Sequence, residues 1–285
     1  MALSGDSYFS NAIVGVPQIG ADVNVYEQHS APRFALGTKF ERQDGAIFRY
    51  AHFGAAVTSA GLVLSQDTSE SGMALTSACA LTSSSTYQMP DDPLGVYPNT
   101  KGSKYMIITK ASIAADDFAG AYVAATSATT PNVVGQTYRI RGNTATGTPA
   151  SGNFRAELYD RLMTTIGSAS NLMIAGNKFS NLEAASYIST DGVIAGVSIL
   201  SSGTTYPYGW IQTRGICCVK TDVSLSASYP MGGRSAVLST QEAGTVVAAQ
   251  LITAGTNIAI LQPIVGVFVS NGSAESFNFV DVNIM

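Results

Sequence analysis

Hydrophobic and polar residues alternate most clearly between residues 34 and 53. Two strand-like runs, 34–42 (FALGTKFER) and 46–53 (AIFRYAHF), flank a turn at Gln43, Asp44 and Gly45. Asp-Gly between alternating runs is typical of a β-hairpin, because both residues tolerate a positive φ. An apolar run at 61–64 predicts a third strand. The alternation places the following side chains on common faces: Phe34, Leu36, Thr38 and Phe40 in the first strand; Ile47, Arg49, Ala51 and Phe53 on one side of the second strand, and Phe48, Tyr50 and His52 on the other.

Short apolar runs return in the last third of the chain. They lie roughly 8 to 15 residues apart with glycine at most of the intervening turns, which is typical of a β-sandwich or small barrel. The final alternating run predicts a closing strand that contains Phe277, Phe279, Val280, Val282 and Ile284. The six predicted strands lie within 193–200, 208–220, 235–240, 245–252, 257–270 and 276–284.

The middle of the chain has a mixed pattern. Runs at 104–110 and 136–141 predict strands, whereas 154–166 (FRAELYDRLMTTI) predicts a short helix. Apolar residues recur there every four positions, at Phe154, Leu158, Leu162 and Ile166, and Met163 widens the apolar stripe. Asn153 precedes this segment as a candidate N-cap.

These patterns predict a mainly β protein, with sandwich-like or barrel-like domains, one or two short helices and an extended N-terminal arm. The expected divisions are an arm at 1–32, a hairpin region at 33–103, a mixed region at 104–190 and a C-terminal β region at 191–285. Residues 33–285 form either one or two compact domains. The arm lies on its own domain or on a neighbouring molecule, or else it adds a strand to the same sheet.

Charged residues are unusually few. They make up 12% of the 285 residues, against ~25% in typical soluble chains. Such a surface favours burial against neighbours in a symmetric assembly, although a monomer covered by serine and threonine is the alternative. The net charge is −4 and the 15 lysines and arginines are dispersed, which argues against nucleic-acid binding.

Targeting segments are not evident in the sequence. The first residues lack the basic and apolar regions of a secretory signal, and no apolar run reaches the ~18 residues of a membrane-spanning helix. We therefore expect neither a signal peptide nor a membrane partner.

Few residues have a spacing that indicates chemistry. The two histidines are His29 and His52, and no carboxylate or serine motif lies at a useful spacing, so a surface or interface role is expected. Adjacent cysteines in a strand point to opposite faces, and no metal-ligand spacing surrounds any cysteine, which predicts small buried side chains. The three cysteines are Cys79, Cys217 and Cys218.

The acidic residues and one aromatic run leave alternatives open. Solvated loop carboxylates are expected at Asp91, Asp92, Asp116 and Asp117, with Ca²⁺ binding as the alternative. Glu157 and Asp160 fit surface ion pairs with Arg155 and Arg161 better than an acid–base pair. The run containing Tyr206, Tyr208 and Trp210 fits a core edge or subunit contact, with a sugar-stacking platform as the alternative. No catalytic, cofactor or metal residue is predicted, and we expect no enzymatic activity.

Two stretches together carry a family resemblance. The first is 34–50, with the pattern F-x-L-G-T followed by D-G-x-x-F-R-Y, and the apolar strand at 60–63 after it. The second is 208–215 (YGWIQTRG), followed by the glycine-punctuated strands that end in SFNFVDVNI. This combination resembles structural proteins of tailed-phage particles, especially the head decoration (cement) proteins of marine and cyanobacterial phages.

The resemblance implies a non-enzymatic virion protein, assembled in the host cytoplasm, that binds the outside of an icosahedral capsid. It implies two partners, the major capsid protein and further copies of the chain in a homotrimer at capsomer junctions, and it transfers no catalytic residues and no cofactor. The arm at 4–32 is then expected to contact the shell or a neighbouring subunit.

Other classes stay open. The chain could instead be a tail fibre, baseplate, tail-tube or major capsid protein. A carbohydrate-binding module or glycosidase is a further alternative, and it depends on Trp210 and the carboxylates.

Overall fold

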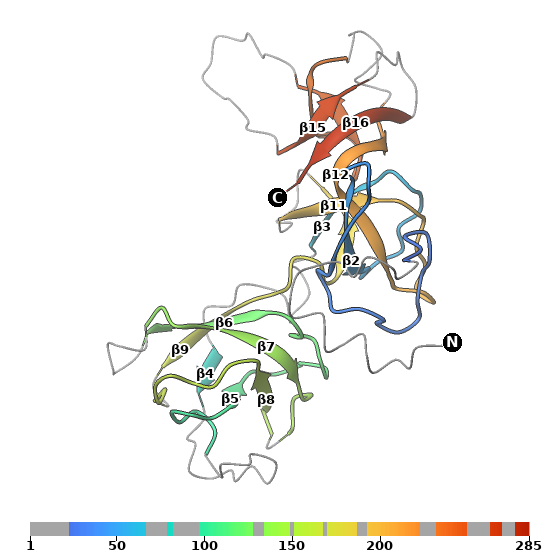
Figure 1. Cartoon of the computed structure of the whole chain (residues 1–285). Helices are drawn as coiled ribbons and strands as arrows, with labels where there is room; N and C mark the ends of the chain where they lie inside the picture. The colour runs from blue at the N-terminus through green and yellow to red at the C-terminus, as the bar shows by residue number, and fades with distance from the viewer. Residues whose placement is uncertain are drawn as a thin grey trace, which may run out of the picture. The chain divides into compact units, whose positions relative to one another are not determined.

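The computed structural model describes residues 23–66, 79–81, 97–127, 134–148, 151–167, 170–186, 193–222, 232–249, 263–269 and 277–284. These residues contain sixteen β-strands and no helix, so the predicted mainly β class is confirmed. The chain forms two compact units (Figure 1). One comprises Met1–Asp67 with Lys178–Met285, and the other, Thr68–Asn177, is inserted within it. These boundaries differ from the divisions at 103 and 190 expected from the sequence.

The inserted unit is a closed β-barrel. Its interior is filled by large apolar side chains such as Ile108, Phe118 and Phe154, and the last two rings lie 5.5 Å apart. The pairing of Cys79–Leu81 with Asn171–Ala175 closes the ring. In order around the barrel, the strands are β4 (Cys79–Leu81), β5 (Tyr105–Thr109), β8 (Asn153–Leu158), β7 (Thr137–Asn143), β6 (Tyr122–Ser127) and β9 (Asn171–Ala175).

The helix predicted at 154–166 is wrong. Strand β8 occupies the start of this segment and pairs with β5 and β7. Phe154 and Leu158 are four residues apart, and a spacing of four also places two side chains on the same face of a strand. Leu162 and Ile166 lie in an irregular segment after β8, and their side chains are buried in the barrel core. The Leu162 N–H donates to the Ser103 carbonyl at 2.8 Å, and the Ile166 N–H donates to the Asn99 carbonyl at 2.9 Å. Asn153 accepts a hydrogen bond from the Thr109 hydroxyl at 2.8 Å instead of capping a helix.

The other unit is a single curled sheet. Its strands run in the order β10 (Leu182–Ala184), β3 (Val63–Gln66), β11 (Ile194–Ser198), β12 (Tyr208–Lys220), β16 (Phe277–Asn283), β15 (Ile264–Phe268), β13 (Ser235–Leu238) and β14 (Val246–Ala248). Thr221, directly after β12, bridges Val246 of β14, so this end of the sheet curls back on itself around a core that includes Val219, Phe268 and Val280. All six C-terminal strands predicted from the sequence are confirmed.

The predicted hairpin is also confirmed. Strands β1 (Lys39–Glu41) and β2 (Ile47–His52) pair antiparallel, and β2 also pairs antiparallel with β12. The turn requires glycine, because Gly45 has a φ of +84°. Phe48 and Tyr50 lie in an aromatic cluster, whereas Ala51 and Phe53 lie in the apolar cluster on the other side of the sheet, as the alternation predicted.

The end of the predicted N-terminal arm lies on its own unit. Val25 is buried in the aromatic cluster, and the His29 N–H donates a hydrogen bond to the Tyr208 carbonyl at 2.8 Å. Residues 1–22, which form most of the predicted arm, lie outside the described residues.

Candidate docking surface

Strand β12 is covered on both faces in its first half and on one face in its second half. Trp210 packs in the aromatic cluster, and Ile211 packs in the apolar cluster on the other face. Beyond Arg214 the pattern alternates: Cys217 is buried, whereas Ile216 is 60% exposed. This change in burial occurs at Arg214, where the pairing of β2 with β12 ends, so the hairpin lies along the first half of β12 only.

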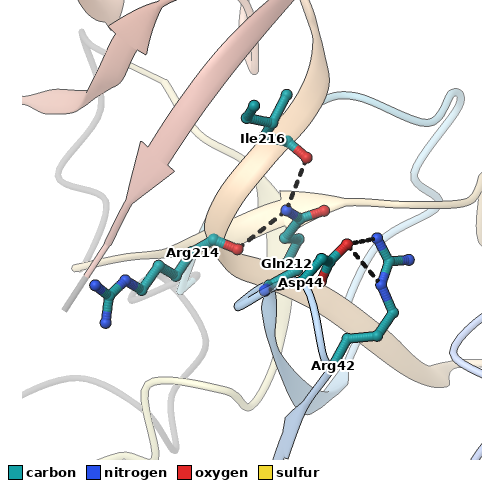
Figure 2. Close-up of polar contacts among 6 residues, drawn as sticks. Arg42, Asp44, Gln212, Arg214 and Ile216 are labelled. Carbon is teal, nitrogen blue, oxygen red and sulfur yellow. Dashed lines mark hydrogen bonds and ion pairs between the residues drawn. The ribbon is translucent and has the colours of Figure 1, made fainter.

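A buried glutamine stabilises this transition. The Gln212 side-chain amide donates hydrogen bonds to the carbonyls of Arg214 and Ile216 at 3.0 and 3.2 Å (Figure 2). The register shifts at the same place, between Gln212 and Arg214. Next to it Gly215 has a φ of +92°, and a Cβ there would lie 3.1 Å from the Ala46 Cα. The amide therefore satisfies two strand carbonyls at the point where the partner strand ends.

The hairpin turn lies beside this bend. Arg42 forms an ion pair with Oδ2 of Asp44 (Figure 2). Oδ1 of the same carboxylate accepts a hydrogen bond from the Ala46 N–H at 3.0 Å. Arg42 and the Ala46 hydrogen bond hold the pKa of the Asp44 carboxyl below its usual value. Both charged side chains are half-exposed and partner each other, so this turn is a local brace and not a reactive group.

An apolar surface begins where the hairpin ends. Strands β12 and β16 bury alternate residues in the curled core, so the intervening residues point away from it. In β15, a register shift against β13 leaves both Ile264 and Val267 exposed, although they are three residues apart. Directly opposite residues share a face, and the pairing places Ile216 and Val267 on either side of Asp281. We call this surface the outer face and define it by its exposed apolar side chains, Ile216, Ile264, Val267, Val269, Phe277 and Phe279.

One exposed anion, Asp281, lies near the centre of the outer face, and one exposed cation, Arg214, lies at the end nearest the hairpin. Asp281 lies between Ile216 and Val267, and Arg214 lies one alternation further along β12, opposite Asn283. Neither charged side chain forms an ion pair among the described residues. The second basic residue of this half of β12, Lys220, is paired with Glu242 at 2.6 Å.

The two histidines flank one tyrosine. Tyr208 pairs with His29 on one side and with His52 on the other, and the His52 and Tyr208 rings lie 4.8 Å apart. Burial and Arg33 lower the pKa of His29, with Glu27 opposing them, and burial alone lowers the pKa of His52. His29 Nδ1 is buried without a hydrogen-bond partner. Both imidazoles are therefore neutral at pH 7, and the Glu27 carboxylate, 3.9 Å from His29 Nε2, is paired with Arg33 at 2.9 Å.

Trp210 is buried and so cannot serve as a stacking platform. Its ring lies 5.2 Å from Phe34 and 5.3 Å from Tyr50, and 3% of the residue is exposed. Tyr206 is half-exposed on a loop and Tyr208 packs against Tyr50. The sugar-binding alternative therefore loses the ring on which it depended.

The acidic residues play local roles. Asp116 accepts a hydrogen bond from the Asn143 N–H at 3.2 Å, and Asp117 accepts one from the Ala114 N–H at 2.7 Å, so both brace the loop before β6. Glu157 pairs with Arg141 at 3.0 Å and not with Arg155 or Arg161. Asp160 is exposed, whereas Asp91 and Asp92 lie outside the described residues.

The cysteines follow the strand alternation. Cys217 is buried as predicted, whereas Cys218 is exposed, so the prediction of a buried side chain is wrong for Cys218. Both are free thiols. Burial raises the pKa of Cys217 to about 12, so this thiol is inert at neutral pH. Cys79 begins β4. No group of histidine, cysteine and carboxylate side chains capable of holding a metal ion occurs among the described residues.

No protein family, curated protein or solved structure matches this chain. No helix among the described residues is long and apolar enough to cross a membrane. The outer face was not singled out from the sequence, although the closing strand was. The sequence feature that indicates the outer face is a strand with apolar residues on both of its faces, with Phe277 and Phe279 on one face and Val280 and Val282 on the other.

Proposed function

We propose that this chain is a structural protein of a phage particle that binds the outside of the icosahedral capsid and clamps neighbouring capsid subunits. The observation that carries the proposal is the outer face, an apolar surface on a chain with few charges, which supports a role in an assembly of protein subunits. Large exposed apolar patches mark interaction sites in soluble proteins. The sequence resemblance to head decoration proteins supports the same role.

Physical arguments favour an assembly role over a solitary one. A stable protein interface buries at least ~1,200 Å² in total, and a weakly charged β surface can provide such area without desolvating many charges. Repeated attachment at symmetry-related sites adds avidity to individually weak contacts. A clamp of this kind needs no catalytic residue.

The proposed partners are the major capsid protein and further copies of this chain, with a homotrimer as the expected oligomer. The proposed location is the capsid exterior, after assembly in the host cytoplasm. We assign the contact of the arm with a shell protein or a neighbouring subunit to the part of the chain before Val25, because Val25 and His29 pack on their own unit. Another virion role, in a tail fibre, baseplate, tube or shell, is the second candidate, because it shares the same outer face.

Immunogold labelling of phage particles that carry this chain tests the proposal. Antibodies against the purified chain are expected to label the capsid exterior at many sites. Purified chain is also expected to co-sediment with heads that lack it, and a chain without residues 1–22 to co-sediment less. Label confined to the tail would select the second candidate, and particles without the chain would remove both.

A further inference from the structure

We infer that the outer faces of neighbouring copies of this chain pack together around the symmetry axis of an oligomer, with each outer face contacting that of the next copy. This contact rests on the proposed assembly function only in requiring that the chain associates with itself. It is not a contact with the capsid shell, which another part of the chain has to supply.

The backbone of these strands has little capacity left for strand addition. Strand β16 is paired on both sides, with β12 and β15, and β15 is paired with β13 and β16. On the free side of β12, the Gln212 amide occupies two carbonyls and the Lys220 N–H donates to the Gly61 carbonyl at 2.8 Å. A partner therefore meets the side chains of the outer face, as two sheets do when they pack face to face.

The apolar area is close to what an interface requires. Ile264, Ile216 and Phe279 are 65%, 60% and 55% exposed. Together with the other members, the outer face exposes on the order of 500 Å² of apolar surface, which is as large as the largest patch on a typical monomer. A standard interface takes ~800 Å² from each partner, so this patch supplies the apolar centre and the polar rim supplies the rest.

The charges select a second copy as the occupant. Arg214 and Asp281 are both exposed, neither is in an ion pair among the described residues, and they lie near each other on the outer face. Lys39, with a smaller contribution from Arg214, lowers the pKa of Glu41, and Lys39 holds this carboxylate in an ion pair. A surface with one unpaired cation and one unpaired anion is complementary to itself, because Arg214 of each copy can meet Asp281 of the next. An unrelated partner of one charge sign would leave one of the two unsatisfied.

Analytical ultracentrifugation of the full chain over a range of concentrations tests this inference. We expect a discrete oligomer, and we expect Ile216→Lys to shift it to monomer because a lysine would be buried in the apolar centre. Val193→Lys is the matched control, because Val193 is 61% exposed in the same unit but is not part of the outer face. It should leave the oligomer intact.

Charge reversal tests the choice of partner. Arg214→Glu and Asp281→Arg should each weaken association at least about tenfold, because each places like charges opposite one another. The double variant should regain the oligomer. Circular dichroism is expected to show similar thermal midpoints for the monomeric forms of all variants, because neither Arg214 nor Asp281 forms an ion pair among the described residues.

Three outcomes would overturn the inference: a wild-type chain that stays monomeric at every concentration, an oligomer that survives Ile216→Lys, or a double variant that stays monomeric. Alkylation of Cys218 by iodoacetamide gives an independent readout, because this exposed thiol lies opposite Phe279 and should react more slowly in the oligomer. An oligomer that assembles through this face but does not co-sediment with heads would remove the decoration proposal and leave this inference intact.

Discussion

His29 and Tyr208 exchange two backbone hydrogen bonds, with N–O distances of 2.8 and 3.1 Å. This exchange ties the segment before the hairpin to the first residue of β12. On its other side Tyr208 pairs with His52, so both histidines of the chain meet at one strand residue. Phe34 from the same lead segment packs 5.2 Å from Trp210, the only tryptophan.

Acid should loosen this attachment. The pKa of His29 in the folded chain lies below the ordinary value of 6.5, so both states are neutral well above that pH and the histidine has no effect on stability there. As the pH falls below 6.5, the unfolded segment binds a proton first, and the free energy of unfolding decreases until the folded pKa is passed. Trp210 fluorescence is expected to shift to the red between pH 7 and about pH 5.

His29→Gln provides the comparison for the acid titration, because glutamine does not titrate. The variant should show a smaller fluorescence shift than the wild type over the same pH range. An equal shift in both proteins would assign the acid response to His52 or to carboxylates elsewhere.

Gln212→Met should destabilise the unit that contains β12. The substitution keeps the length of the side chain but leaves the carbonyls of Arg214 and Ile216 without their donor. Because Gln212 is buried, we expect a loss of about 2 kcal/mol in the free energy of unfolding, measured by urea titration with Trp210 fluorescence. Gln28→Met removes one exposed hydrogen bond to the Ser201 carbonyl and should cost less than about 0.5 kcal/mol. Equal losses would mean that the buried amide has no special role.

Asn143→Ala should destabilise the barrel. The Asn143 amide group donates to the Ala114 and Thr144 carbonyls, and its oxygen accepts from the Phe118 N–H at 2.8 Å. Removing this buried side chain leaves a loop without three hydrogen bonds, and we expect a loss of about 3 kcal/mol in barrel stability. Asn171→Ala, at an exposed position of β9, is the control for thermal unfolding. A melting temperature unchanged by Asn143→Ala would contradict this role.

The two units should unfold in separate transitions. The large apolar cluster around Phe154 lies wholly within the inserted unit, and the cluster around Phe268 lies wholly within the other. Phe154→Ala should lower only one calorimetric transition and Phe268→Ala only the other, each by about 3–5 kcal/mol of stability. A single transition that both substitutions shift equally would show that the units fold cooperatively.

Local patterns predicted the strands well. The hairpin followed from alternation and Asp44-Gly45, and the separation of Cys217 from Cys218 followed from strand geometry. The segment around Phe154 and Leu158 was misassigned because a spacing of four residues fits one face of either a helix or a strand. Only the pairing of β8 with β5 and β7 distinguishes the two.

The arrangement of distant segments could not be read from the sequence. The pairing of β3 with β10 joins residues on either side of the whole inserted unit, and nothing local indicates that partner. The role of Gln212 depends in the same way on where β2 ends. Burial of Trp210 depends on Phe34 and Phe40, which arrive from a remote part of the chain.

The pairing of Gln66 with Leu182 also bears on how the gene could change. The chain enters the barrel shortly after β3 and returns shortly before β10, so the two strands that flank the insertion are paired neighbours. Domain insertions are tolerated where the ends lie close together. A recombination event could therefore gain, lose or exchange the barrel as a cassette, with a short turn closing the remaining strands. Selection on whatever the barrel contacts could then proceed without altering the sheet that holds the outer face.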